Sequence, residues 1–321
     1  MRALAAAQGL PGAAWLSRHA IWVVLLLLLA VAALVSTAFV QPAYLFNTVR
    51  QATPIGITAL GVTLVMILGG VDLSVGAVIS LAAVMCAIVM NGEPGAIPLA
   101  VALTLATGAG IGLLNGLLIA FNRVSPFILT LGMAIVIYGA TLIYSGGTAK
   151  GAVSPGFREA LNMRVLEVVP VLALILLALA ALTAAVLRWT RFGRTLYLVG
   201  ANREAAYLAG LPLRWVTVAA YTASGFFAAL GGIALLARAG VSSTYAGRGY
   251  EFDVLAAVVL GGTTFAGGRG GAGGTLAGVF VLFVAFNLVN IAGLAIWAQL
   301  ALKGFIIIAA SAAYEGLRRR G

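Results

Sequence analysis

IWVVLLLLLAVAALVSTAFV, at residues 21–40, is the stretch that decides the fold class of this chain. It carries no charge over about 20 residues, which as a helix is long enough to cross the hydrocarbon core of a bilayer. The run is too long for the core of a signal peptide, and no small-residue cleavage signature follows it, so we expect it to remain in the mature protein. The chain is therefore predicted to span a membrane.

The composition of the whole chain supports the same class. Hydrophobic residues make up 63% of the 321 residues and charged residues 8%, whereas a soluble domain carries roughly 25% charged residues. We predict an all-α fold, a single polytopic transmembrane helical bundle over residues 1–321 with about ten spans. The predicted spans are 21–40, 55–69, 75–91, 97–121, 127–145, 168–187, 215–237, 252–262, 274–293 and 296–314.

The basic residues predict the orientation of the bundle. The net charge is +11, but the basic residues lie at the ends of apolar runs, as the positive-inside rule produces, and not along one nucleic-acid-binding face. An inside N-terminus puts twelve arginines in the cytoplasm and six basic residues outside. Both termini are then cytoplasmic. One cysteine, Cys86, and one histidine, His19, offer neither a disulfide framework nor a metal site.

One predicted span is too short to cross alone. Residues 252–262 would form a helix of ~16 Å, which is either a half-helix that turns back or part of a crossing. A turn back would put Arg318, Arg319 and Arg320 outside, against the charge rule. We therefore prefer a crossing in which the glycine-rich stretch after this helix is partly buried in protein.

Glycines inside the spans predict close helix contacts. The chain has 41 glycines, and Gly108, Gly112 and Gly116 share one helix face at four-residue spacing. Small residues let membrane helices approach one another, since lipid supplies no hydrophobic drive between them. We read this face as packing alone.

The first informative polar stretch is GGVDLSVG at 69–76, which we interpret as a helix break. One helix ends at Gly69 and Gly70, and the next begins before Gly76 with Asp72 or Ser74 as the N-cap. An acid at this depth is costly, so Asp72 is either held by backbone donors or used in function. A proton or cation relay would need partner charges, and these spans hold none, which disfavours a proton- or sodium-coupled carrier.

The second stretch, 188–214, is the longest polar segment assigned to the cytoplasm. Asn202 is predicted as a helix N-cap, Glu204 suits the first turn, Gly210 follows the helix and Pro212 stops it. A helix of about seven or eight residues is marginal alone in water. It therefore docks on its own chain or on a partner, or else lies on the bilayer as an amphipathic turn.

The third stretch, 261–275, is rich in glycine and invites comparison with phosphate-binding loops. A Walker A loop needs Gly-Lys-Ser/Thr after a strand, and this stretch has no lysine and no strand before it. A nucleotide site is disfavoured, and close backbone packing at a broken helix is the better interpretation.

These stretches resemble, in order, the permease subunits of ribose-type ATP-binding-cassette (ABC) importers, within the branched-chain-type permease superfamily. The matching elements are GGVDLSVG at 69–76, GLLNG at 112–116 with SPFILTLG at 125–132, Gly193-Arg194 through GANREAAYLAG at 200–210, and YEFD at 250–253 running into the paired glycines of 261–268. They cover nearly the whole chain after the first span. Ala209 stands where the family usually has serine and Leu211 where it has isoleucine, and 270–274 is richer in glycine than is typical.

The resemblance implies that the short helix near 202–210 inserts into a groove on a separate ATPase subunit. The ATPase-coupling residues would be Arg194, Gly200, Asn202, Glu204, Ala205, Ala206 and Gly210. The implied partners are ABC ATPase subunits that bind ATP and Mg²⁺, a second permease chain that is identical or a paralogue, and a periplasmic solute-binding protein. The chain itself is expected in the bacterial inner membrane, to bind no cofactor or metal, and to have no catalytic residue.

Neutral polar side chains are expected along a translocation path for a sugar, whose hydroxyls both donate and accept hydrogen bonds. The candidates are Asn115, Thr130, Asn287 and Asn290, for which hydrogen bonding between helices is the alternative role. An importer for nucleosides or branched-chain amino acids is the nearest alternative function. A passive channel or secondary carrier would leave the 193–211 segment without a use, and an integral membrane enzyme would need clustered acids or histidines in a span.

Overall fold

The computed structural model describes residues 11–122, 124–165, 167–291, 293, 301 and 304–305. The described part is mostly helical, with one short pair of strands, so the predicted all-α class is confirmed. Six of its helices are long and apolar enough to cross a membrane: α3 (Pro42–Ile67), α5 (Ile97–Asn122) with the turn η3 (Pro94–Ala96) before it, α6 (Pro126–Ser145), α8 (Val171–Trp189), α11 (Leu213–Ala239) and α13 (Ala272–Ile291). The predicted tenth span, 296–314, lies outside the described residues except for 301 and 304–305.

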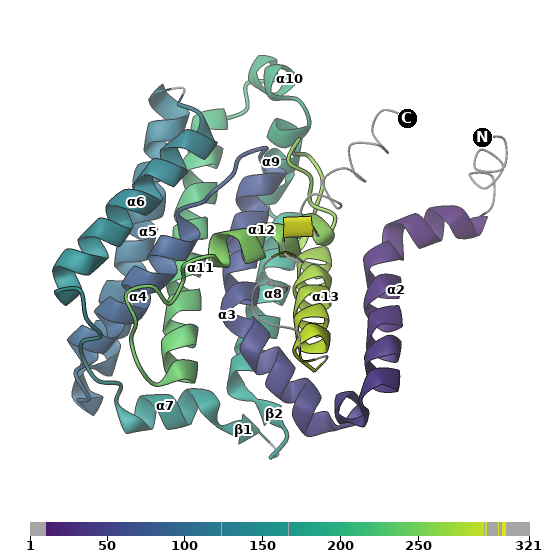
Figure 1. Ribbon diagram of the computed structural model, residues 1–321. Coiled ribbons are helices and arrows are strands. Elements are labelled where there is room, and N and C mark those ends of the chain that lie inside the picture. Colours follow the sequence, from purple (N-terminus) through teal and green to yellow (C-terminus); the bar gives the residue numbers. More distant parts are fainter. Residues whose placement is uncertain are drawn as a thin grey trace.

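The remaining elements complete the described chain (Figure 1). Two are apolar, namely α2 (Pro11–Val35), which stands beside α13, and α4 (Val75–Met90), which follows the helix break. The others are η2 (Thr37–Val40), α7 (Pro155–Asn162), β1 (Arg164–Val165), β2 (Val169–Pro170), α9 (Arg191–Ala201), α10 (Arg203–Leu208) and α12 (Tyr250–Leu260). The strands β1 and β2 form one antiparallel pair in which Val165 faces Val169.

Two helices form the centre of the bundle. The most apolar stretch of α3 is 89% buried and that of α11 is 72% buried, whereas those of α5 and α6 are each 22% buried. In Figure 1 the central pair stands between α4, α5 and α6 on one side and α13 on the other. The outer helices present leucine, isoleucine and valine outward, as lipid-facing surfaces do.

The glycine face of α5 packs against α11. A Cβ atom on Gly112 would overlap the carbonyl oxygen of Tyr221, and one on Gly116 would come within 2.8 Å of the Cα of Val218. Gly108 lies against Gly225 and Ala229 in the same way. The predicted packing role of this face is confirmed.

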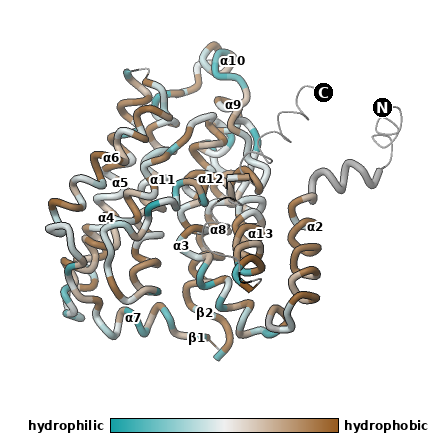
Figure 2. The backbone as a smooth tube through the Cα atoms, viewed as in Figure 1, coloured by the Kyte–Doolittle hydropathy of each residue, from teal (hydrophilic) through white to brown (hydrophobic). Residues whose placement is uncertain are grey.

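Hydrophilic segments lie at the two ends of the bundle, and a further one lies at mid-height near α12 (Figure 2). The helices α9 and α10 lie at one end, and α7 with the β1–β2 pair lies at the other (Figure 1). The sequence predicted neither α7 nor the strands. Within 188–214 it predicted one helix where the structure has α9 and α10.

The predicted span 55–69 begins too late, because α3 starts at Pro42. The hydropathy of this first part is lowered by Asn47, Thr48, Arg50 and Thr53. The structure satisfies these groups inside the helix or beside it. Thr48 Oγ1 donates to the carbonyl of Tyr44 at 3.1 Å, and Thr53 Oγ1 donates to that of Val49 at 2.9 Å. A polar helix start is therefore compatible with a buried helix.

The short helix expected at 252–262 is present as α12, with eleven residues, and it is not one of the six long apolar helices. Figure 1 shows it lying across the middle of the bundle. The glycine-rich stretch after it is partly buried, as predicted, because Thr263 has no exposed surface and Gly268 N donates to the carbonyl of Ile67 at 2.8 Å.

Candidate functional site

The helix break between α3 and α4 is built around the buried side chain of Asp72. Gly69 turns the chain with φ +84°, a conformation that glycine adopts without strain. Asp72 Oδ1 accepts from Ser74 N at 3.0 Å and from Ser74 Oγ at 2.6 Å, and Oδ2 accepts from Ser224 Oγ at 2.8 Å. The acid is therefore held by hydrogen-bond donors, and one of them is the backbone N–H of Ser74 at the start of α4. This is one of the two roles that the sequence left open for Asp72.

Three other helices bond to the break. From α5, Asn115 Nδ2 donates to Ser74 Oγ at 3.0 Å. From α6, Thr130 Oγ1 accepts from Leu73 N at 3.1 Å. From α11, the Tyr221 hydroxyl donates to the carbonyl of Val71 at 3.1 Å. Segment 71–74 is thus hydrogen-bonded to α5, α6 and α11, and any movement of the segment must change these bonds.

The helix α10 is capped at both ends as the sequence predicted. Asn202 Oδ1 accepts from Ala205 N at 2.9 Å, and Glu204 lies in the first turn. At the other end Gly210 has φ +70°, Gly210 N donates to Tyr207 O, and Leu211 N donates to Ala206 O. These two bonds form a Schellman motif. The helix spans six residues, slightly fewer than expected.

The helix α10 projects from the end of the bundle with apolar side chains exposed. Tyr207 is 72% exposed and Leu208 80%, whereas Ala206 is buried against the rest of the chain. Ala205 is exposed, as is Arg194 on α9, whose Nη1 donates to the carbonyl of Trp189 at 3.3 Å. An exposed aromatic and leucine pair on a short, firmly capped helix is a surface that fits a protein partner.

The three polar stretches singled out in the sequence meet next to α9. We call this place the glycine junction, and it consists of Gly200 on α9, Ile67 and Gly69 at the end of α3, and residues 267–270. A Cβ atom on Gly200 would overlap the carbonyl oxygen of Ile67 and come within 2.6 Å of Gly268 N. The Tyr197 hydroxyl on α9 donates to the carbonyl of Gly270 at 2.8 Å. Burial raises the pKa of Tyr197 above its usual value, which is already high enough to keep this hydroxyl protonated at neutral pH. The junction connects α9, which leads directly into α10, to the helix break by direct contacts.

The four residues proposed for a path do not form one cluster. Asn115 and Thr130 are fully buried at the helix break. Asn287 lies on α13, where its Nδ2 donates to Thr48 Oγ1 at 3.1 Å, and Asn290 is exposed near the end of that helix.

A pocket of about 340 Å³ lies between α6 and the segment that leads into α12. We call it the α6–α12 pocket; its lining residues are Leu73, Leu131, Ala134, Ile135, Tyr138, Tyr245, Arg248, Glu251 and Phe252. Sequence reasoning missed it, although Glu251 stands directly before an apolar segment, and an acid in that place can indicate a functional site. Tyr138 gave no such indication, because a tyrosine on an apolar helix is expected only to pack against its neighbours.

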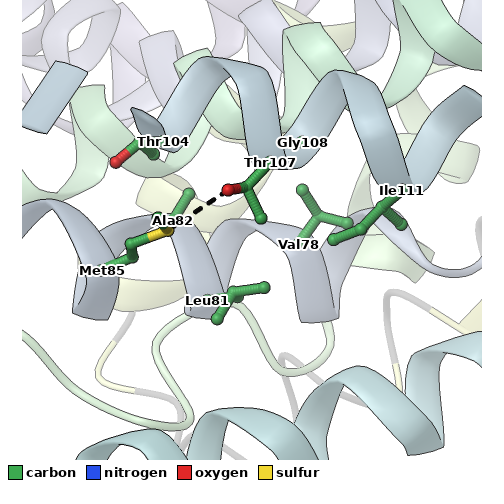
Figure 3. Close-up of a pocket in the computed structure, with 8 residues that line it drawn as sticks. All are labelled: Val78, Leu81, Ala82, Met85, Thr104, Thr107, Gly108 and Ile111. Carbon is green, nitrogen blue, oxygen red and sulfur yellow. Dashed lines mark hydrogen bonds between the residues drawn. The ribbon is translucent and has the colours of Figure 1, made fainter. Parts of the chain in front are cut away.

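A second hollow lies between α4 and α5 (Figure 3). Its walls are mostly apolar, with Thr107 Oγ1 donating to Met85 Sδ at 3.4 Å, and it has no room for a water molecule. It belongs to helix packing. Within the part of the chain that the structure describes, no group of three or more His, Cys, Asp or Glu side chains is placed to hold a metal ion.

The comparisons with known proteins agree with this architecture. The family model for the branched-chain amino acid transport system / permease component matches residues 44–311. The ribose import permease protein of Escherichia coli strain K12 is 37% identical over 305 residues, which is 92% of this chain and 93% of that protein. The ribose import permease protein of Bacillus subtilis strain 168 is 35% identical, over 89% of each chain. The galactose/methyl galactoside import permease protein of Haemophilus influenzae is 36% identical, over 92% of this chain and 94% of that protein.

No solved structure matches the chain at a comparable level. The family model covers well over half of the sequence, and it includes the helix break, α9, α10 and the α6–α12 pocket. The chain therefore belongs to the family of branched-chain amino acid transport system permease components, and it resembles the ribose and galactose import permeases within it.

Proposed function

We propose that this chain is the membrane-spanning permease subunit of an ABC importer that carries a sugar or sugar-like solute, of the ribose or monosaccharide kind, across the bacterial inner membrane. Its relatives in Escherichia coli, Bacillus subtilis and Haemophilus influenzae are named as ribose and galactose import permeases. The observation that carries the proposal furthest is α10, a capped helix that exposes Tyr207 and Leu208 and is linked to the helix break through the glycine junction.

In this proposal α10 docks in a groove of a separate ATPase subunit. Asn202, Glu204 and Gly210 shape the helix, and Ala205 permits close approach to the ATPase. Ala206 packs the helix against its own chain, and Arg194 and Gly200 belong to the α9 support. The permease performs no chemistry itself. The ATPase binds ATP and Mg²⁺, a periplasmic binding protein delivers the solute, and a second permease chain completes the path. The two states of the bundle differ in how the helices pack, and ATP binding favours one of them.

The proposed topology has about ten crossings and both termini in the cytoplasm, on the side of α10. In it, α12 and the glycine-rich stretch up to Gly271 together make one crossing. The support is the contact of Gly268 with Ile67 at the glycine junction, next to α9. The roles of Asn115, Thr130, Asn287 and Asn290 along a path stay predictions.

The nearest alternative solute is a branched-chain amino acid, because the family description names one. The presence of both Arg248 and Glu251 in the α6–α12 pocket favours it, since a zwitterion needs both charges. The relatives in Escherichia coli, Bacillus subtilis and Haemophilus influenzae are named for sugars, which is why the sugar is the main proposal.

The test is uptake of radiolabelled ribose, galactose and leucine into proteoliposomes. One set contains this chain with its ATPase and its binding protein, and a matched set contains this chain alone. We expect sugar uptake in the complete set only, and only with ATP. Equal uptake by the chain alone without ATP would identify a channel or secondary carrier. ATP-driven uptake of leucine and not of sugar would establish the alternative.

A further inference from the structure

The α6–α12 pocket has the size and position of a solute site. Its volume, about 340 Å³, is at the low end of small-molecule pockets, which suits a single sugar ring better than an oligosaccharide. One face of α6 forms a wall, with Leu131, Ala134, Ile135 and Tyr138 at helical spacing. The segment from Tyr245 to Phe252 forms the other wall, and Leu73 of the helix break contributes between them.

The pocket cannot face lipid. The helix α12 lies across the middle of the bundle (Figure 1), and Glu251 is in its first turn. Arg248 precedes it in the same wall. Charged side chains at membrane depth face protein or a water-filled cavity, because exposing them to hydrocarbon is costly. The open side of this pocket, where Tyr245 and Phe252 are half exposed, therefore faces an aqueous space or the second permease chain.

Tyr138 supplies an unused polar group. Its hydroxyl is buried close to Ser80, and among the described residues it makes no hydrogen bond of good geometry. A buried tyrosine hydroxyl normally has a partner. Ser80 is at most a partial partner, because its hydroxyl already donates to the carbonyl of Gly76 at 3.3 Å and accepts from Gly247 N at 2.9 Å, which leaves one lone pair for Tyr138. The ring of Tyr138 lines the pocket, and a shift of this ring on solute binding would bring its hydroxyl, which has almost no exposed surface, to a solute oxygen.

The remaining polar groups complement the hydroxyls of a sugar. One Glu251 oxygen accepts from Gly249 N at 3.1 Å, and a carboxylate has further lone pairs for two or more donors. The Arg248 guanidinium, a donor, lies 5.8 Å from the centroid of the Tyr245 ring. The pocket wall therefore contains an acceptor (Glu251), a donor (Arg248), a phenol that can do both (Tyr138) and an exposed aromatic ring (Tyr245). Such a set suits a molecule with several hydroxyls on an apolar carbon ring.

We propose that the α6–α12 pocket is a transient binding site for a neutral monosaccharide on its way through the permease, contacted by Tyr138, Arg248 and Glu251. This inference rests on the proposed function and specifies where the solute binds. The site is also coupled to the helix break. Leu73 lines the pocket while its N–H is bonded to Thr130, the neighbour of Leu131, and the Glu251 carboxylate packs against Gly76 of α4. A movement of the break therefore changes the shape of the pocket.

The test compares Tyr138→Phe and Glu251→Gln with Tyr144→Phe in the complete transporter in proteoliposomes. Tyr144 is on the same helix and outside the pocket. We expect Tyr138→Phe to lower the rate of sugar uptake by about threefold to tenfold, as the loss of one hydrogen bond does. For Glu251→Gln we expect a loss of about tenfold or more, because its bonds are charge-assisted. Tyr144→Phe should transport like the wild type.

Stability separates binding from folding. Removal of a hydroxyl without a partner should leave the Tm of Tyr138→Phe unchanged or slightly raised, so a slower uptake at unchanged Tm supports a solute contact. Wild-type uptake by both pocket variants, or a fall in uptake that follows a fall in Tm, would overturn the inference. Wild-type proteoliposomes that take up no sugar with ATP would overturn the proposed function itself, and the inference with it.

Discussion

Asp72 shows how a single acid is accommodated inside an apolar bundle. Its two oxygens accept three hydrogen bonds, two from Ser74 and one from Ser224, and its side chain is almost completely buried. Asp72→Ala would leave these donors without an acceptor. Each unsatisfied buried donor costs about 1–3 kcal/mol, so we expect a loss of about 3 kcal/mol or more in the free energy of unfolding. Thermal unfolding in detergent would measure it.

Ser224→Ala is the matched control for Asp72→Ala. It removes one of the three bonds and leaves the two from Ser74, so the expected loss is about 1 kcal/mol. If Asp72→Ala unfolded at the wild-type temperature, the bonds around the break would not contribute to stability.

At the scale of single residues, the sequence predicted caps better than it predicted binding groups. Asn202 and Gly210 follow local rules of backbone geometry, which the neighbouring residues determine. Tyr138 and Tyr144 are both tyrosines on one apolar helix, and no local rule separates them. Only the approach of the 245–252 segment makes Tyr138 part of a pocket.

Among the helices, the contact of α5 with α11 depends on the size of a few residues. Gly112 lies against the backbone of Tyr221, whereas a Cβ atom on Gly110, two residues away, would meet none of the described neighbouring atoms within 4 Å. We expect Gly112→Ala to destabilise the bundle by about 1–3 kcal/mol through overpacking. Gly110→Ala should be neutral or slightly stabilising, because alanine favours helix. Thermal unfolding of the pair tests this, and equal Tm values would show that α5 can move aside without cost.

The helix α10 should respond to its cap independently of the bundle. It has six residues and touches the rest of the chain mainly through Ala206, so its order depends on its ends. Asn202→Ala should weaken the first turn by about 1 kcal/mol. We expect faster amide exchange at 205–209 and a lower rate of ATP-driven uptake, with an unchanged Tm of the bundle. Asn202→Asp, which keeps the cap, should restore both; exchange that stays slow in Asn202→Ala would contradict the prediction.

The boundaries of the elements show where hydropathy fails as a guide. It placed α5 and α6 to within a residue, since both are apolar throughout. It missed the first half of α3, where threonine hydroxyls bond back to the helix carbonyls, and it missed α7, whose face toward the bundle is a single buried phenylalanine, Phe157. Hydropathy detects segments that are apolar throughout. It does not detect a membrane helix whose polar groups are hydrogen-bonded within the protein.

On the scale of the whole molecule, the stretches singled out in the sequence lie far apart in the chain and meet at two places. Gly200 and 267–270 join the end of α3 at the glycine junction, and Glu251 joins Gly76 beyond the break. The sequence predicted the stretches but not their meeting, because long-range contacts depend on helix packing that no single segment specifies. The contacts form a series from α9, which leads into α10, to the α6–α12 pocket.

The glycine junction should therefore carry the coupling between ATP hydrolysis and transport. Gly200→Ala would push α9 away from the carbonyl of Ile67 and from Gly268, at a cost of about 1–3 kcal/mol. We expect the complete transporter to keep hydrolysing ATP while the number of sugars carried per ATP falls severalfold. Gly271→Ala is the control, since its nearest neighbour is the Tyr197 hydroxyl at 3.8 Å, an ordinary contact. Tyr197→Phe, which loses only the bond to Gly270, should lower the same ratio more mildly. Full coupling in both Gly200→Ala and Tyr197→Phe would show that the movement reaches the break by another route.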